Sequence, residues 1–143
     1  MSNEVKWVYA SQVTLEDSGA SAASDVFLAA DDTTLASGNH SDFPLADFVL
    51  HADFGGTPTN GAVRLYRRDL NIDGTADAPV PSATYSNTYM GTFTIPASTT
   101  AFYSMTEVPL TKDCQFYIEN ATGQNLSAGW DLKVTPKTYG PTA

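Results

Sequence analysis

The sequence of 143 residues has no apolar stripe of helical period, only one cysteine and few basic residues. Cys114 has no second thiol in the chain, so an internal disulfide is excluded. Seven Lys and Arg against sixteen Asp and Glu give a net charge of −9, which would repel nucleic-acid phosphates. No apolar run approaches the roughly 20 residues that a membrane helix needs. We therefore expect a protein that contacts neither nucleic acid nor membrane.

Residues that would support catalysis are also scarce. His40 and His51 fit no zinc-binding spacing, and no nucleophile elbow G-x-S-x-G is present. Asp47 and Asp53 share one face of an expected strand, but six residues of strand separate them by about 20 Å, too far for a glycosidase pair. Cys114 alternates with apolar neighbours, which indicates a buried, inert thiol. The sequence therefore predicts that the chain is not an enzyme.

Short alternating runs separated by Gly, Pro, Asn and Asp fill most of the chain. In the run 130–134, Trp130, Leu132 and Val134 fall on one face and two charged residues on the other, the period of a half-buried strand. The run 46–54 alternates in the same way, and Asn60-Gly61 before the next run is a strong turn signal. This pattern is typical of a strand-and-turn protein.

The runs are spaced at roughly ten residues, and about eight strands are expected. This tally predicts an all-β protein: a single-domain, antiparallel β-sandwich that is jelly-roll-like. Residues 1–143 form one domain, with 1–20 as an N-terminal strand or arm and 136–143 as a C-terminal tail. Residues 25–30 suit a buried strand or a helical turn, and 115–119 with 129–135 suit a closing hairpin. The expected strands are 5–9 (extending through 13–15), 25–30, 33–37, 46–54, 62–68, 90–95, 102–105 with 108–110, 115–119 and 129–135.

A long, proline-containing loop is expected from 69 to 87, and loops of this length are often functional. Asp69, Asn71, Asp73 and Asp77 resemble the start of a calcium-binding loop. The twelfth position is Val80, where such a loop carries a bidentate Glu. A turn-rich loop without metal is the preferred interpretation, so no cofactor is expected, and Ca²⁺ is the weaker alternative.

Aromatic residues are the best candidates for contact with a partner, because they are enriched at the centres of interfaces. Trp7 and Tyr9 belong to the N-terminal arm, and Tyr85, Tyr89 and Tyr103 lie in or near the long loop. Alternation with apolar neighbours makes a core position the default for Trp7 and for Trp130. A sugar-stacking platform would need an exposed, coplanar set of such rings.

Three segments carry a family resemblance: ADFVLHADFGGTPTNGAVRLYRRDLNIDGT, YMGTFTIPAS and FYIENATGQNLSAGWDLKVTP. With them the chain resembles the decoration, cement or head-stabilising proteins of tailed bacteriophages. The resemblance implies a non-enzymatic virion protein, made in the host cytoplasm, that docks on the outer capsid surface and bridges capsomers. It also implies that the partners are the major capsid protein and further copies of the chain, commonly as a homotrimer. Such a family has no fixed functional residues to carry over.

Two alternatives remain open. A carbohydrate-binding, lectin-like module is also a β-sandwich and would use the loop tyrosines, with or without calcium. A tail-fibre or receptor-binding component would share the same strand-and-turn pattern and would bind host cells in place of heads.

Overall fold

The computed structural model describes residues 5–35, 43–59, 61–86, 88–96 and 100–141. His40 lies outside the described residues. Within the described ranges the chain forms nine strands: β1 (Val5–Tyr9), β2 (Val13–Gly19), β3 (Val26–Leu35), β4 (Leu45–Asp53), β5 (Gly61–Asp69), β6 (Tyr89–Ile95), β7 (Thr100–Pro109), β8 (Cys114–Ala121) and β9 (Trp130–Pro141).

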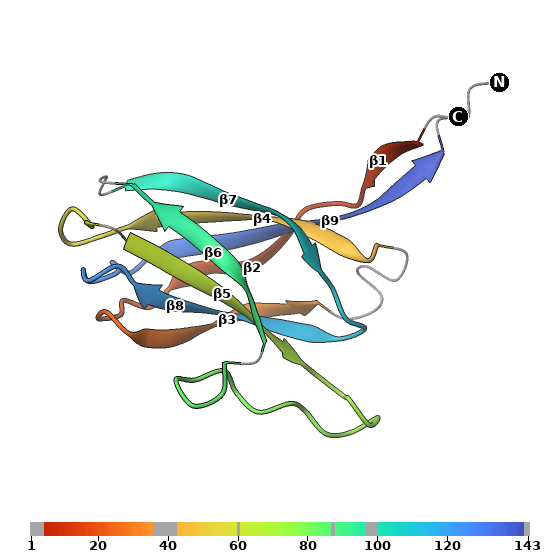
Figure 1. The fold of residues 1–143 in the computed structure, drawn as a ribbon, viewed down its shortest axis with the longest axis horizontal. Coiled ribbons are helices and arrows are strands. Elements are labelled where there is room, and N and C mark those ends of the chain that lie inside the picture. Colours follow the sequence, from red (N-terminus) through yellow and green to blue (C-terminus); the bar gives the residue numbers. More distant parts are fainter. Residues whose placement is uncertain (1–4, 36–42, 60, 87, 97–99, 142–143) are drawn as a thin grey trace.

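Two antiparallel sheets pack face to face, so the predicted all-β sandwich is confirmed (Figure 1). The five-stranded sheet has the order β1-β9-β4-β7, and β2 also pairs with β9 beside β1. The four-stranded sheet has the order β3-β8-β5-β6. From β2 to β9 the chain changes sheet at every connection except β5 to β6. The finer jelly-roll topology stays a prediction.

The core lies between the sheets and is built by residues that alternate along each strand. Phe48 and Leu50 of β4 are fully buried, and Phe48 meets Phe116 of β8 edge to face, with ring centroids 4.7 Å apart. Burying each such side chain contributes about 1.5–3 kcal/mol to folding. Cys114 is buried as expected, and burial raises the pKa of its thiol to about 11, which leaves it unreactive near neutral pH.

The N-terminal strands differ from their predicted boundaries. The first expected strand is two strands, β1 and β2, and β2 continues through Gly19 by means of two register shifts against β9. Residues 26–35 form the single strand β3, so a strand, and not a helical turn, is correct there. Residues 36 and 37, which the prediction included in a second strand, lie outside the described residues.

A bulge explains why β7 reads as two pieces in the sequence. The register against β4 shifts between the Ala46–Val108 and Phe48–Met105 pairs. Glu107 adopts a φ of 61°, and its N–H donates to the side chain of Asp47 at 3.1 Å. Such a bulge adds a residue to one strand without ending it, and it breaks the alternation that sequence analysis follows.

The predicted closing hairpin is wrong, because β8 and β9 belong to different sheets. The segment between them crosses the edge of the sandwich, and Leu126 in its middle is buried and bridges both Ala22 and Phe54. The buried side chain of Asn120 donates to the carbonyl oxygens of Ala22 and Gln124, at 3.3 and 2.8 Å. We call the connection between β8 and β9 the arch. The side-chain hydrogen bonds of Asn120 hold it to the segment that precedes β3.

The predicted C-terminal tail is also wrong for residues 136–141, which continue β9. This half of β9 pairs with β1 from Tyr9–Lys137 to Val5–Pro141. Together the two strands form a ribbon that extends away from the sandwich (Figure 1). We call it the terminal ribbon, meaning β1 together with residues 137–141. The N-terminal arm expected from the sequence is thus a paired strand.

Candidate functional site

A cleft of about 470 Å³ lies on the outer face of the four-stranded sheet, between the sheet and the loop that joins β5 to β6. Arg64 and Tyr66 point away from the core because Val63 and Leu65, which alternate with them in β5, point into it. Arg64 pairs with Glu119 of β8, and Glu119 pairs with Phe27 of β3, so these side chains form one row across the sheet. The lining comprises Phe27, Arg64, Tyr66, Tyr89 and Glu119 from the strands and Ser82, Ala83 and Ser86 from the loop.

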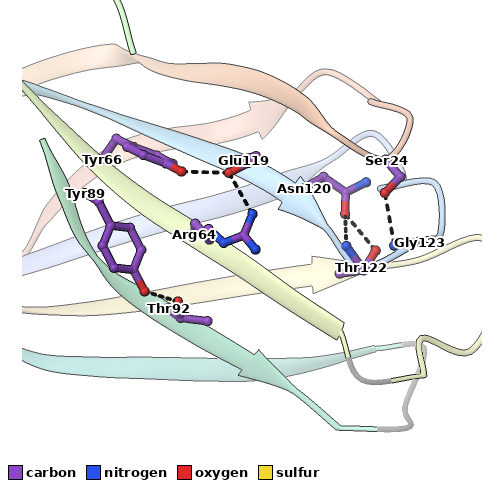
Figure 2. A network of polar contacts seen from close by, with 9 residues as sticks. All are labelled: Ser24, Arg64, Tyr66, Tyr89, Thr92, Glu119, Asn120, Thr122 and Gly123. Atoms are coloured by element: carbon purple, nitrogen blue, oxygen red, sulfur yellow. Dashed lines mark hydrogen bonds and ion pairs between the residues drawn. The ribbon is translucent and has the colours of Figure 1, made fainter. Parts of the chain in front are cut away.

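Glu119 is the centre of a polar network in this cleft (Figure 2). Its Oε2 accepts a hydrogen bond from Tyr66 Oη at 2.7 Å and an ion-pair hydrogen bond from Arg64 Nη1 at 3.1 Å. Tyr89 lies beside them and hydrogen-bonds to Thr92. A buried carboxylate needs such partners, because an unpaired charge away from water is costly.

The network also determines the ionisation of its members. Burial, together with the hydrogen bond to Glu119, raises the pKa of Tyr66 to about 12, so its hydroxyl stays protonated and donates. The hydrogen bond that Arg64 donates to Glu119 raises the pKa of Arg64. The two charges offset each other, and the cleft presents aromatic rings and hydrogen-bonding groups without a net charge.

The outer face of the five-stranded sheet is the second candidate surface. Residues paired across antiparallel strands share a face, and so do residues an even number apart along one strand. By these rules the pairs Tyr139–Trp7, Lys137–Tyr9 and Asp131–His51–Phe102 all lie on the outer face. Four large apolar side chains here are mostly exposed: Val5 (66%), Tyr9 (54%), Phe102 (72%) and Tyr139 (59%).

The terminal ribbon is held in shape by contacts around a buried lysine. Trp7 and Tyr139 stack with ring centroids 3.9 Å apart, and Lys137 Nζ lies 3.8 Å from the centroid of Trp7. Lys137 also pairs with Asp47 at 2.7 Å and Glu107 at 4.0 Å. Burial alone would lower the pKa of Lys137, but the hydrogen bond and charge of Asp47 raise it. The base of the ribbon is therefore anchored to β4 and β7.

At the other end of this face, Phe102, His51 and Asp131 form a row across β7, β4 and β9. The rings of His51 and Phe102 stack with centroids 4.3 Å apart, and His51 Nδ1 lies 3.1 Å from Asp131 Oδ2. His51 therefore packs across strands, as its position on the polar face of β4 indicates.

The five aromatic candidates are not brought together. Trp7 is half-buried in the terminal ribbon and not in the core, whereas Trp130 is a core residue as expected. Tyr9 is exposed on the ribbon, Tyr89 lines the cleft, and Tyr85 lies in the loop beside it. Tyr103 is only 6% exposed and belongs to the core, so its proposed role as an exposed contact is wrong. The alternation of β7 places its neighbour Phe102 outside instead.

The calcium-loop candidates do not converge on a common point in the described structure. Asp69 Oδ1 accepts from Arg67 and Thr111, at 2.8 and 2.7 Å. Asp73 Oδ1 accepts from the N–H groups of residues 75 and 76, which closes a turn that includes Gly74 at a φ of 99°. Asn71 and Asp77 are joined by a backbone-to-carboxylate hydrogen bond of 3.1 Å. The pattern of Asp, Asn and Gly therefore forms turns.

Three other carboxylates gather at the β2–β3 edge. Oxygens of Glu16, Asp17 and Asp32 lie within 4.8 Å of one another, the one such acidic group among the described residues. Glu16 accepts from the N–H of Ser18 at 3.2 Å, and Asp32 accepts from the N–H of Asp17 at 2.7 Å. Burial raises the pKa of Glu16, with the charge of Asp32 adding to this and the backbone hydrogen bonds opposing it.

Glu16→Gln is expected to stabilise the protein at pH 7 by about 0.5 kcal/mol. A carboxyl with a raised pKa in the folded state supports folding below its unfolded pKa, and that support is lost as pH rises through the folded value. The amide of the variant stays neutral at every pH. The free energy of unfolding of the variant relative to wild type should therefore increase between pH 4 and pH 7. Urea unfolding at both pH values measures this, with Asp25→Asn, an exposed acidic residue outside this group, as control. An equal difference in the free energy of unfolding between Glu16→Gln and wild type at both pH values would contradict the raised pKa of Glu16.

Sequence analysis did not find Phe27, Arg64, Tyr66 or Glu119 as site residues. The outward position of Arg64 and Tyr66 can be read from the alternation in β5. What the sequence does not show is that β8 lies beside β5 and that Glu119 comes opposite Arg64. Phe102, likewise, became a surface candidate only through the register of β7 against β4.

Comparison with protein families, with curated proteins and with solved structures found no match for this chain. Among the described residues, no helix is long and apolar enough to cross a membrane.

Proposed function

We propose that this chain is a non-enzymatic virion protein of tailed bacteriophages that decorates the outer capsid surface and bridges capsomers of the major capsid protein. The observation that carries the proposal is the exposure of Val5, Tyr9, Phe102 and Tyr139 on the outer face of the five-stranded sheet. Exposed aromatic and aliphatic side chains concentrated on one face mark a surface that binds another protein.

The terminal ribbon suits this role. It extends beyond the sandwich (Figure 1). On a capsid, the ribbon would contact a neighbouring subunit while the sandwich lies over another. Its base is anchored by Lys137, Asp47 and Glu107, which limits the entropy lost when it docks. Among the described strands, β1 pairs with β9 alone, which leaves its other edge for main-chain pairing with a partner strand.

The strand order supports a jelly-roll topology for the chain. If β1 and β2 count as one edge strand, the sheets have the orders β1/β2-β9-β4-β7 and β3-β8-β5-β6. Each sheet then has four strands, and the chain alternates between them apart from one hairpin, β5–β6. Double-sheet jelly rolls with eight strands occur in viral capsid and lectin domains, so this topology suits both proposed functions.

A homotrimer is proposed as the active form, because three linked contacts bind far more tightly than one through effective concentration. The localisation that follows is the outside of the virion head, after synthesis in the host cytoplasm. Analytical ultracentrifugation should give three times the mass of one chain.

Removing exposed aromatic contacts should weaken head binding without unfolding the protein. Phe102→Ala combined with Tyr139→Ala is expected to lower affinity by at least about tenfold, since interface hot spots contribute about 2 kcal/mol or more. The measurement is co-sedimentation with empty heads of the phage that encodes the chain, with the melting temperature as a check of folding. Tyr89→Ala, an exposed tyrosine of the other sheet, is the matched control and should bind normally. No co-sedimentation of the wild-type chain would reject the proposal.

A second candidate function is a carbohydrate-binding module, favoured by the uncharged aromatic cleft. A tail-fibre or receptor-binding component is the remaining alternative, and it predicts adsorption to host cells in place of heads. The head-binding experiment separates these functions because only decoration requires the outer face of the five-stranded sheet.

A further inference from the structure

The cleft on the four-stranded sheet has a volume and a lining that suit a polar, uncharged ring. Its volume of about 470 Å³ falls within the range of small-ligand sites, about 300–1,000 Å³. Strands supply its floor, and the loop segment 82–86 supplies one wall. Because the floor belongs to a hydrogen-bonded sheet, the groups that line it are held in place before any ligand arrives.

The charges of the cleft select against an anion. Among the described residues of the lining, Arg64 is the only cationic one, and Glu119 pairs with it at 3.1 Å. A phosphate or carboxylate ligand would have to compete with Glu119 for the guanidinium and would lie beside a buried negative charge. A neutral ligand avoids both costs, and it still finds a strong donor in Arg64, whose side chain is 43% exposed.

The aromatic rings supply an apolar surface beside these polar groups. Tyr89 is 46% exposed at the mouth of the cleft, and its ring lies 5.8 Å from that of Tyr66, which in turn lies 5.2 Å from Phe27. One side of a saccharide ring presents C–H groups, which pack on such a ring, while its edge presents hydroxyls. These hydroxyls both donate and accept, so they match an arginine donor, a carboxylate acceptor and the two serines of the wall.

We propose that this cleft binds a neutral saccharide ring that stacks on Tyr89 and directs its hydroxyls to Arg64 and Glu119. Among the described residues, both hydrogen bonds to Glu119 reach Oε2, and Oε1 is the oxygen that would accept from a ligand hydroxyl. Tyr66 then acts as a positioning residue, because its hydroxyl holds the carboxylate and touches no ligand. The inference rests on the second candidate function and does not depend on head docking.

The test is an NMR titration of the ¹⁵N-labelled chain with the methyl glycosides of glucose, galactose, mannose and N-acetylglucosamine. At least one should shift the amides around Arg64, Tyr89 and Glu119 with millimolar affinity. Tyr89→Ala should bind at least about tenfold more weakly, whereas Tyr89→Phe, which keeps the ring, should bind within about twofold of wild type. Tyr139→Ala, on the other sheet, should bind as wild type does.

Three outcomes would overturn the inference: no shift with any of the four sugars, shifts confined to other surfaces, or equal binding by Tyr89→Ala. Stronger binding of inorganic phosphate or of a nucleoside at the same residues would also reject it. Thermal melting of each variant separates loss of binding from loss of folding. If Tyr89→Ala loses sugar binding but still sediments with heads, the cleft and the docking face are independent sites.

Discussion

Gly19→Ala is expected to lower the free energy of unfolding by about 3 kcal/mol or more, at the upper end of the cost of overpacking. Gly19 lies opposite Trp130 where β2 pairs with β9. A Cβ at Gly19 would lie 2.0 Å from Cε2 of the Trp130 indole, well inside contact distance. The indole is 2% exposed and donates from Nε1 to the carbonyl of Ala20 at 2.9 Å, so moving it loses both packing and a hydrogen bond.

Gly55→Ala is the matched control for this substitution. The nearest atoms to a Cβ at Gly55 belong to Asn125, at 3.8 Å, so the change should stay within about 0.5 kcal/mol. Urea unfolding followed by far-ultraviolet circular dichroism measures both variants. Adding Trp130→Phe should recover part of the loss caused by Gly19→Ala, because the smaller ring makes room for the methyl group. Equal stability of the two alanine variants would show that Trp130 does not cover Gly19.

Asn120→Asp is expected to cost about 3 kcal/mol or more at pH 7, although it changes the side-chain volume very little. Asn120 is fully buried, and its amide nitrogen lies 3.3, 3.2 and 2.8 Å from the carbonyl oxygens of Ala22, Ala23 and Gln124. A carboxylate would replace this donor with a negative charge that faces three acceptors. Its pKa would rise in the folded state, so the penalty should shrink as pH falls through the folded value and be smallest below the unfolded pKa of about 4.

Asn125→Asp tests the same chemical change at an exposed position of the connection that follows β8 and should alter stability by about 0.5 kcal/mol or less. Denaturant unfolding at pH 7 and pH 3.5 compares the two variants. A small effect of Asn120→Asp at pH 7 would mean that the arch between β8 and β9 does not depend on this side chain. The arch explains why the chain can leave one sheet after Ala121 and enter the other at Trp130.

The strands themselves were readable from the sequence, because one face of each strand faces the core. In β4, Phe48, Leu50 and Ala52 are buried and the residues between them are not fully buried, as the period of two requires. The same pattern located β5, β6 and β8 within one or two residues. It failed at β7, where the bulge near Glu107 interrupts the alternation within one continuous strand.

Strand pairing was not readable, since alternation shows which side chains are inside but not which strand lies alongside. A hairpin and an arch between β8 and β9 give the same apolar pattern in both strands. The connector decides between them, and its buried Leu126 and the buried Asn120 before it indicate that the segment crosses the sandwich. In the sequence these two residues resemble an ordinary turn rich in Asn, Thr and Gly.

The residues of the candidate surfaces also divide into those whose exposure follows from the sequence and those whose exposure depends on strand pairing. Tyr9 and Tyr89, two of the aromatic candidates for contact with a partner, are exposed. Tyr103 was not separable from Phe102, because the face that each occupies depends on the register of β7 against β4. Glu119 carries no local signal of function, and it becomes part of a cleft only because β8 lies between β3 and β5.

The two surfaces lie on opposite sides of the sandwich, on the outer faces of different sheets. In the docking mode that we propose, one sheet contacts the capsid through Phe102 and the terminal ribbon, and the cleft of the other sheet faces away from the capsid. A decoration protein arranged in this way would present a binding site to the outside of the virion. It also predicts that substitutions on one face leave the function of the other unchanged, since additivity holds for separate sites.

The most direct test of the docking claim is a cryo-electron-microscopy reconstruction of empty heads incubated with the purified chain. We expect added density on the outer capsid surface, with the five-stranded sheet and the terminal ribbon against the major capsid protein and the cleft facing outward. Heads without added density, or density in which the four-stranded sheet contacts the shell, would contradict it.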